Sequence, residues 1–176
     1  QVGADLLVQH AFKLNGRDNN PDWVLPHEGP GKGQKDNFGK VGATLKAKVS
    51  QTELKVGELL PVSPVLVFDP SRQLLTTFSG AWLESKDIKD TKLTLAYIDK
   101  INNRYDNQFR DLTKFNPGAG QFDTGAEADG MYIAGIDHQF NKEIGASYWY
   151  ADVKDIYQQH YVGANYKTTL GEKAKL

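Results

Sequence analysis

Residues 59–80 read LLPVSPVLVFDPSRQLLTTFSG, and this stretch decides how the rest of the chain is interpreted. It lies between two strand-like segments, yet it is more apolar than a loop surrounded by water. Pro61, Pro64 and Pro70 exclude a regular helix or a central strand here. An apolar loop stiffened by prolines needs a protected place. We therefore expect residues 59–80 to fold into the interior of a barrel and to narrow it.

The composition favours an all-β protein. The chain has 176 residues, 17 of them glycine, 8 tyrosine and 8 phenylalanine, which suits a fold with many turns. The formal net charge of −1 gives no electrostatic case for nucleic acid. The absence of cysteine excludes disulfides and thiolate metal sites. No apolar run is long enough for a transmembrane helix. The N-terminal residues do not show the charged-then-apolar pattern of a signal segment, so we expect any signal peptide to have been removed or to lie upstream of Gln1.

Alternation of apolar and polar residues predicts about eight strands. They are residues 2–14, 40–49, 52–58, 81–85, 91–101, 131–138, 145–152 and 157–168. Residues 15–38 and 102–128 are expected to be long loops, so the connections alternate between long and short. Outer-membrane barrels sort their loops in this way, with short turns on the periplasmic side. The pattern therefore predicts an antiparallel transmembrane β-barrel.

The end of the chain does not resemble the end of a complete barrel. Residues 169–176 are interpreted as a charged turn, with no closing strand that ends on an aromatic residue. Eight strands could close a small barrel, but side chains would fill its interior and leave no room for residues 59–80. We therefore expect residues 1–176 to be part of a larger barrel, with residues 59–80 as its constriction loop.

A two-residue turn at Ser50-Gln51 predicts the register of the hairpin around it. Lys48 would then face Glu53, and Lys46 would face Lys55, on the side opposite an apolar strip. Like charges directly opposite each other are destabilising, so this lysine pair needs a reason. One interpretation is a basic strip on a channel wall that attracts anionic groups. The alternative, a solvated face of a soluble strand with the lysines splayed apart, stays open.

Asp69, Ser71 and Arg72 form the compact polar group of the 59–80 stretch. An arginine in a water-filled constriction can present two parallel donors to a carboxylate. The alternative is a local turn in which Asp69 accepts hydrogen bonds from nearby backbone N–H groups. We favour the turn role for Asp69, while both interpretations stay open for Arg72.

The sequence gives little reason to expect catalysis. The four histidines are scattered without metal-ligand spacing, and no nucleophile motif of the G-x-S-x-G type occurs. We predict that the protein is not an enzyme and that it has no catalytic residues, metal site or cofactor.

Three segments in order resemble the OprD-type substrate-specific porins of Gram-negative outer membranes. They are VSQTELKVG at residues 49–57, the stretch from Pro61 through Ser71-Arg72 to Thr77-Phe78 and Gly80, and ADVKDIYQQHY at residues 151–161. The resemblance covers most of the chain outside the two long polar loops.

The resemblance implies an 18-stranded barrel of monomeric type whose third extracellular loop folds inward. It also implies uptake of small carboxylate-bearing molecules, including basic amino acids, and a route for carbapenems. Arg72 would match the arginine that this loop contributes to a basic ladder, and Lys46, Lys48 and Lys55 would match basic positions before it. Gln73 and Leu75 depart from the usual Leu and Pro, and Gln158 stands where Arg is common. The first two departures put the substrate preference in doubt.

The leading hypothesis is an integral outer-membrane channel for passive, selective uptake. Its pore-lining candidates are Arg72, Lys46, Lys48, Lys55, Asp69 and Ser71. Its partners would be small anionic or zwitterionic molecules and outer-membrane lipid, with no nucleic acid, in a monomer or loose trimer. The rival hypothesis is a soluble β-barrel or sandwich that binds a ligand or serves in adhesion. The two differ in whether an apolar belt faces outward.

Overall fold

A computed structural model describes residues 1–14, 33–71, 74–104, 106–116, 121–170 and 174–175. The strands are β1 (Val2–Phe12), β2 (Asn37–Val49), β3 (Thr52–Leu59), β4 (Thr77–Ser85), β5 (Thr91–Asn102), β6 (Arg110–Asn116), β7 (Gln121–Ala128), β8 (Met131–Gln139), β9 (Ile144–Val153), β10 (Tyr157–Tyr166), β11 (Thr169–Leu170) and β12 (Ala174–Lys175). The described residues contain no helix, so the all-β prediction is confirmed. Among them, therefore, no helix is long and apolar enough to cross a bilayer.

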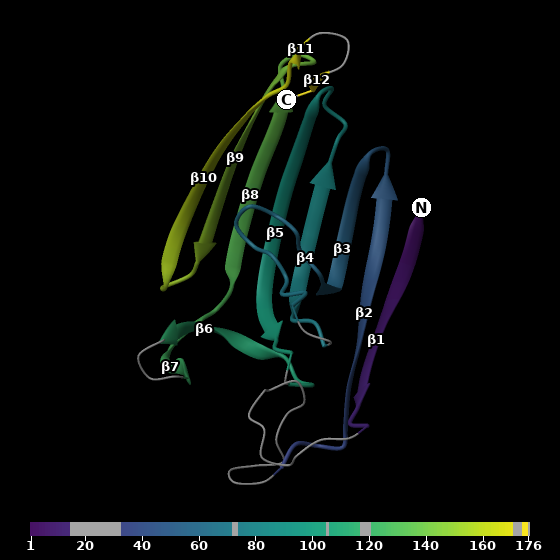
Figure 1. The fold of residues 1–176 in the computed structure, drawn as a ribbon, viewed down its shortest axis with the longest axis vertical. Coiled ribbons are helices and arrows are strands. Elements are labelled where there is room, and N and C mark those ends of the chain that lie inside the picture. The colour runs from purple at the N-terminus through teal and green to yellow at the C-terminus, as the bar shows by residue number, and fades with distance from the viewer. Residues whose placement is uncertain (15–32, 72–73, 105, 117–120, 171–173, 176) are drawn as a thin grey trace.

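The strands form one antiparallel sheet in the order β1-β2-β3-β4-β5-β8-β9-β10 (Figure 1). These eight are the strands predicted from the sequence. In the described sheet, β1 and β10 each pair on one side only, so the sheet is open. A second hairpin, β6 and β7, branches from the end of β5. Turns 50–51, 86–90 and 140–143 gather at one end of the sheet, which we call the turn end; the other is the loop end.

Two segments expected to be loops contain strand. The stretch 102–128 was predicted as loop, but it includes β6 and β7, which pair mainly with each other. β4 begins at Thr77 rather than at residue 81. The register shifts between Ser79 and Gly80, so this glycine lies at a bulge within the strand instead of ending the loop. The loop between β3 and β4 is therefore residues 60–76.

The predicted register around Ser50-Gln51 is confirmed. Lys46 lies opposite Lys55, and Lys48 lies opposite Glu53. Ser50 has a φ of 54°, which is the left-handed conformation that a two-residue hairpin turn requires. The local turn and the alternation therefore fixed which side chains share a face.

The two faces of the sheet differ in character. Val65 of the 60–76 loop packs with Trp82 and Trp149 in one buried cluster. We call this side the loop-covered face and the opposite side the open face. Figure 1 shows the loop crossing in front of β4 and β5. On β1 and β2 the open face is apolar and exposed, through Val2, Leu6, Val8, Val41, Leu45 and Val49. This arrangement is the reverse of a soluble sheet, whose exposed face is polar.

Asp87 ties two neighbouring turns together at the turn end. Its carboxylate accepts hydrogen bonds from Ser50 Oγ at 2.5 Å, Gln51 N at 2.9 Å and Thr52 Oγ1 at 2.6 Å. Bonds from the Ser50 and Thr52 hydroxyls and from the Gln51 N–H lower the pKa of Asp87 to about 2. The ionised carboxylate is therefore the form that holds turns 50–51 and 86–90 together.

Replacing Asp87 by Ala is expected to destabilise the protein at neutral pH but not in strong acid. Because the folded-state pKa is depressed, the stabilisation is present above about pH 4, the usual range of an Asp, and is lost as the pH falls through about 2. Urea midpoints of both proteins, measured in detergent at several pH values, test this. The exposed Lys89 of the same turn supplies the control K89A. A D87A deficit that is constant down to pH 2 would contradict the assignment.

Candidate functional site

The first half of the 60–76 loop forms a compact unit on the loop-covered face. Phe68 N donates to Pro61 O at 2.9 Å, and Val62 and Val67 form a β-bridge. Val65 is buried against the strands, whereas Val62 and Val67 are exposed. Val65 is therefore the buried contact of the unit with the sheet, and the partly buried Leu66 and Phe68 pack against the same cluster.

The second half of the loop contacts different strands. Leu74 is only 1% exposed and forms a separate cluster with Ala11 of β1 and Phe38 of β2. Leu75 N donates to Gln9 Oε1 at 2.7 Å. The loop is thus docked at two places, on strands β4 to β9 through Val65 and on strands β1 and β2 through Leu74.

The predicted polar group lies between these two docking places. Asp69 Oδ1 accepts a hydrogen bond from Ser71 N at 2.8 Å, so the turn role of Asp69 is confirmed. Asp69 Oδ2 also lies 3.3 Å from Arg104 Nη1. Hydrogen bonds from Ser71, with the Arg104 charge as a smaller cause, hold the pKa of Asp69 below its ordinary value. Arg72 lies outside the described residues.

The three predicted lysines lie on the loop-covered face. Lys55 is directly opposite Trp82, and Lys46 is directly opposite Lys55, so all three side chains project to one side. Lys48 follows two residues after Lys46 and projects the same way. The three lysines and the 60–76 loop therefore lie on the same face of the sheet, as predicted.

The like-charge pair is stabilised by two carboxylates. Lys46 forms an ion pair with Asp5 of β1, and Lys55 Nζ lies 3.3 Å from Glu53 Oε2. Lys48 is exposed, and among the described residues its ammonium has no ion-pair partner. Of the three cations, Lys48 is thus the most available to a solute.

Sequence reasoning missed several charged residues on the same face or beside the loop. Lys92 lies 3.5 Å from Asp137 and 5.5 Å from the centre of the Trp149 ring. Arg104, which pairs with Asp69, was also missed, as was the buried Lys40. The period-2 pattern places Lys92 and Lys40 on polar positions of their strands. It does not show which partners the sheet brings to them.

The described side chains of this face can attract and orient small ions. Within the described residues no group of three or more His, Asp or Glu side chains could hold a metal ion. The face offers ammonium groups, half-exposed carboxylates and a docked loop. Charged side chains of this kind occur on channel walls that select solutes by charge.

Comparison with known proteins gives consistent matches along the chain. The family model described as "outer membrane porin, OprD family" matches residues 1–176. The porin-like protein GalP of Pseudomonas putida is 33% identical over 173 residues, which are 96% of this chain and 40% of GalP.

Solved structures with the same sheet are also found. OccAB2 of Acinetobacter baumannii is 39% identical with a TM-score of 0.90, over 99% of this chain and 44% of that one. OpdK of Pseudomonas aeruginosa, solved with vanillate, is 29% identical with a TM-score of 0.83, over 97% of this chain and 43% of that one. The chain therefore spans about two fifths of the length of the proteins it matches.

Proposed function

The chain belongs to the OprD family of outer membrane porins, and from this we propose that its sheet is one wall of a channel for selective, passive uptake of small carboxylate-bearing molecules. The family resemblance and the Gram-negative outer-membrane location, both predicted from the sequence, are confirmed by the family match and the porin relatives. Those relatives are channels and not enzymes. The soluble alternative does not fit membership of an outer-membrane family.

The observation that carries the proposal is the position of the 60–76 loop. It covers the face that bears the lysines, and the opposite face is apolar and exposed. A channel wall requires this division, because its outer side contacts hydrocarbon and its inner side contacts water. On this basis the 60–76 loop, which lies within the predicted stretch 59–80, acts as the constriction loop, and the loop-covered face lines the channel.

The cations would guide the solute through the narrowed section. We assign Lys46, Lys48, Lys55 and Arg72 to the attraction of substrate carboxylates, with Asp69 and Ser71 shaping the loop beside them. Vanillate, named with OpdK, is an aromatic carboxylate, which supports this substrate class. Basic amino acids and carbapenems, implied by the family resemblance, also carry a carboxylate and belong to the same proposal.

The open face would contact outer-membrane lipid. Exposed aromatic side chains lie toward both ends of this face: Phe12 and Tyr132 toward the loop end, and Phe140 and Tyr166 toward the turn end. Such aromatic bands mark the two interfaces of a membrane-spanning barrel. With this belt facing lipid, the protein would act as a monomer or loose trimer.

Replacing Arg72 by Ala is expected to slow the uptake of carboxylate solutes more than that of neutral solutes of equal size. One unit charge at 4 Å in water contributes about 1 kcal/mol, so the carboxylate rate should fall by about fivefold. The measurement is liposome swelling with the full-length protein. K48A is the parallel test on the strand, and K86A, in the exposed turn 86–90, is the control. Equal loss for both kinds of solute would contradict the charge role of Arg72.

A further inference from the structure

Lys40 is a buried lysine on the loop-covered side of β2. It is only 3% exposed, whereas Lys46 and Lys48 on the same strand are partly or fully exposed. A buried ammonium is unfavourable unless its protons are all hydrogen-bonded and its charge is compensated. The hydrogen-bond acceptors of the Lys40 ammonium therefore show which segments of the chain this side chain holds together.

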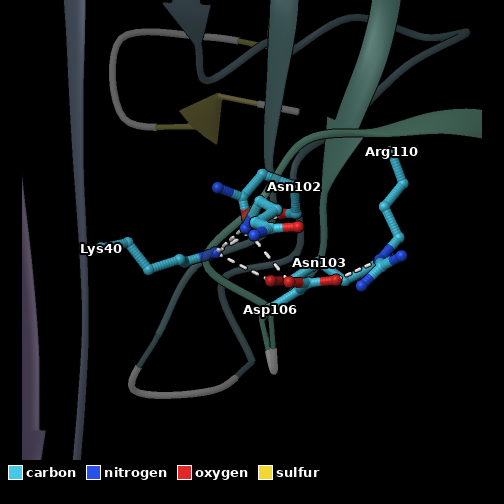
Figure 2. Close-up of polar contacts among 6 residues, drawn as sticks. Lys40, Asn102, Asn103, Asp106 and Arg110 are labelled. Atoms are coloured by element: carbon cyan, nitrogen blue, oxygen red, sulfur yellow. Dashed lines mark hydrogen bonds and ion pairs between the residues drawn. The ribbon is translucent and has the colours of Figure 1, made fainter.

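The ammonium of Lys40 binds acceptors from two distant segments. Its Nζ donates to Leu75 O at 2.7 Å and Asn103 O at 2.9 Å, and it lies 3.2 Å from Asn102 Oδ1 and 3.4 Å from Asn102 O. Figure 2 shows Lys40 extending across to Asn102 and Asn103, with Asp106 beyond them. All three ammonium protons thus have acceptors, none of which is a solute.

Leu75 is the residue through which this contact reaches the loop. Its carbonyl accepts from Lys40 of β2, and its N–H donates to Gln9 of β1. Two residues later, the Thr77 hydroxyl donates to the buried carboxylate of Glu58. The C-terminal end of the 60–76 loop is therefore held by polar contacts to three strands.

Two carboxylates partly compensate the charge of Lys40. The carboxylates of Glu58 and Asp106 attract its ammonium electrostatically. Asp106 also organises the turn after β5, because Asp106 N donates to Asn103 O at 3.0 Å and its carboxylate pairs with Arg110. The Asn103 carbonyl thus receives both Lys40 and the backbone of this turn.

We propose that Lys40 is a positioning residue that clamps the C-terminal end of the 60–76 loop to the end of β5 and so sets the width of the channel. This rests on the proposed channel function. Lys40 acts through the loop and does not meet the solute, which separates it from the exposed Lys48. The hydrogen bonds of an ionised donor are the strong ones, so their loss frees the Leu75 carbonyl from its tie to the wall.

The test is Lys40→Met in the full-length protein, because Met keeps the apolar stem and removes the charge and all three donors. Single-channel current is recorded in a planar bilayer. Losing bonds to a charged donor should raise the population with an undocked loop at least about tenfold. The single sharp conductance level is then expected to be replaced by fluctuation to larger values. K86M, in the exposed turn 86–90, should keep one level.

A second readout follows the loop directly. The chain has no cysteine, so Ser71→Cys can carry a spin label on the exposed part of the loop. Its spectrum is expected to gain a mobile component in the K40M background and not in the K86M background. If K40M does not fold, Lys40→Gln, which removes the charge but keeps a polar end at the buried site, replaces it with the same expectation.

The outcomes separate the two proposals. A folded K40M or K40Q protein with wild-type conductance and an unchanged label spectrum would overturn the clamp and leave the channel intact. A wild-type protein that conducts no ions would overturn the channel function itself.

Discussion

Replacing Val65 by Asp is expected to detach the first half of the 60–76 loop from the sheet. Val65 is buried in the cluster that contains Trp82 and Trp149, whose members are all apolar. An uncompensated buried charge costs roughly 3–5 kcal/mol, so the variant gains free energy by exposing the carboxylate to water. The channel is expected to conduct more current, and the emission of Trp82 and Trp149 should shift to the red.

Val62 supplies the matched control for this prediction. It lies in the same unit and pairs with Val67, but its side chain is 71% exposed. Val62→Asp is therefore expected to keep wild-type fluorescence and conductance. If both variants behave alike, the docking of the loop does not depend on the buried side chain, and the proposed constriction fails.

Replacing Gly57 by Ala is expected to have the largest effect on folding. Gly57 has a φ of 124°, a backbone conformation that residues other than glycine rarely adopt. An added Cβ would lie 2.3 Å from Ala43 O and 3.2 Å from Thr44 Cα, both backbone atoms of the neighbouring strand. Strain and overpacking together should lower the free energy of unfolding by about 2–4 kcal/mol. Urea unfolding in detergent measures this loss.

Gly3→Ala is the control for backbone strain, because nothing lies within 4 Å of the position of its added Cβ. It should leave the unfolding midpoint unchanged. A wild-type midpoint for G57A would show that the ladder tolerates a shift here.

The conformation of Gly57 also marks where the β2–β3 ladder ends. Thr44–Gly57 is the last pair of this ladder. The next residue, Glu58, lies against Gly42 on the loop-covered face.

Features that depend on nearby residues could be predicted from the sequence. The Ser50-Gln51 turn and the alternation on either side of it were sufficient to predict the register from Thr44 to Gly57. The apolar, proline-rich composition of residues 59–80 was sufficient to predict that the loop needs shelter. The turn at Asp69 depends on Ser71, only two positions away, so it could also be predicted from the sequence.

Features that depend on distant pairing could not be predicted. Asp5 compensates Lys46 only because β1 pairs with β2 in one register across the intervening loop. Lys40 appears as an ordinary polar position of a strand, and its partners come from more than 30 residues away. β6 and β7 were missed because their residues do not alternate clearly and each depends mainly on the other for pairing.

The two docking places of the loop have a consequence for the order of assembly. Leu74 clusters with Ala11 and Phe38, which precede the loop in the chain, while Val65 lies in a cluster that includes Trp149, which follows it by 84 residues (149 minus 65). Contacts of such sequence separation form late, since the intervening chain must first be ordered. Full docking of the loop on the sheet is therefore expected to follow the pairing of β8 and β9.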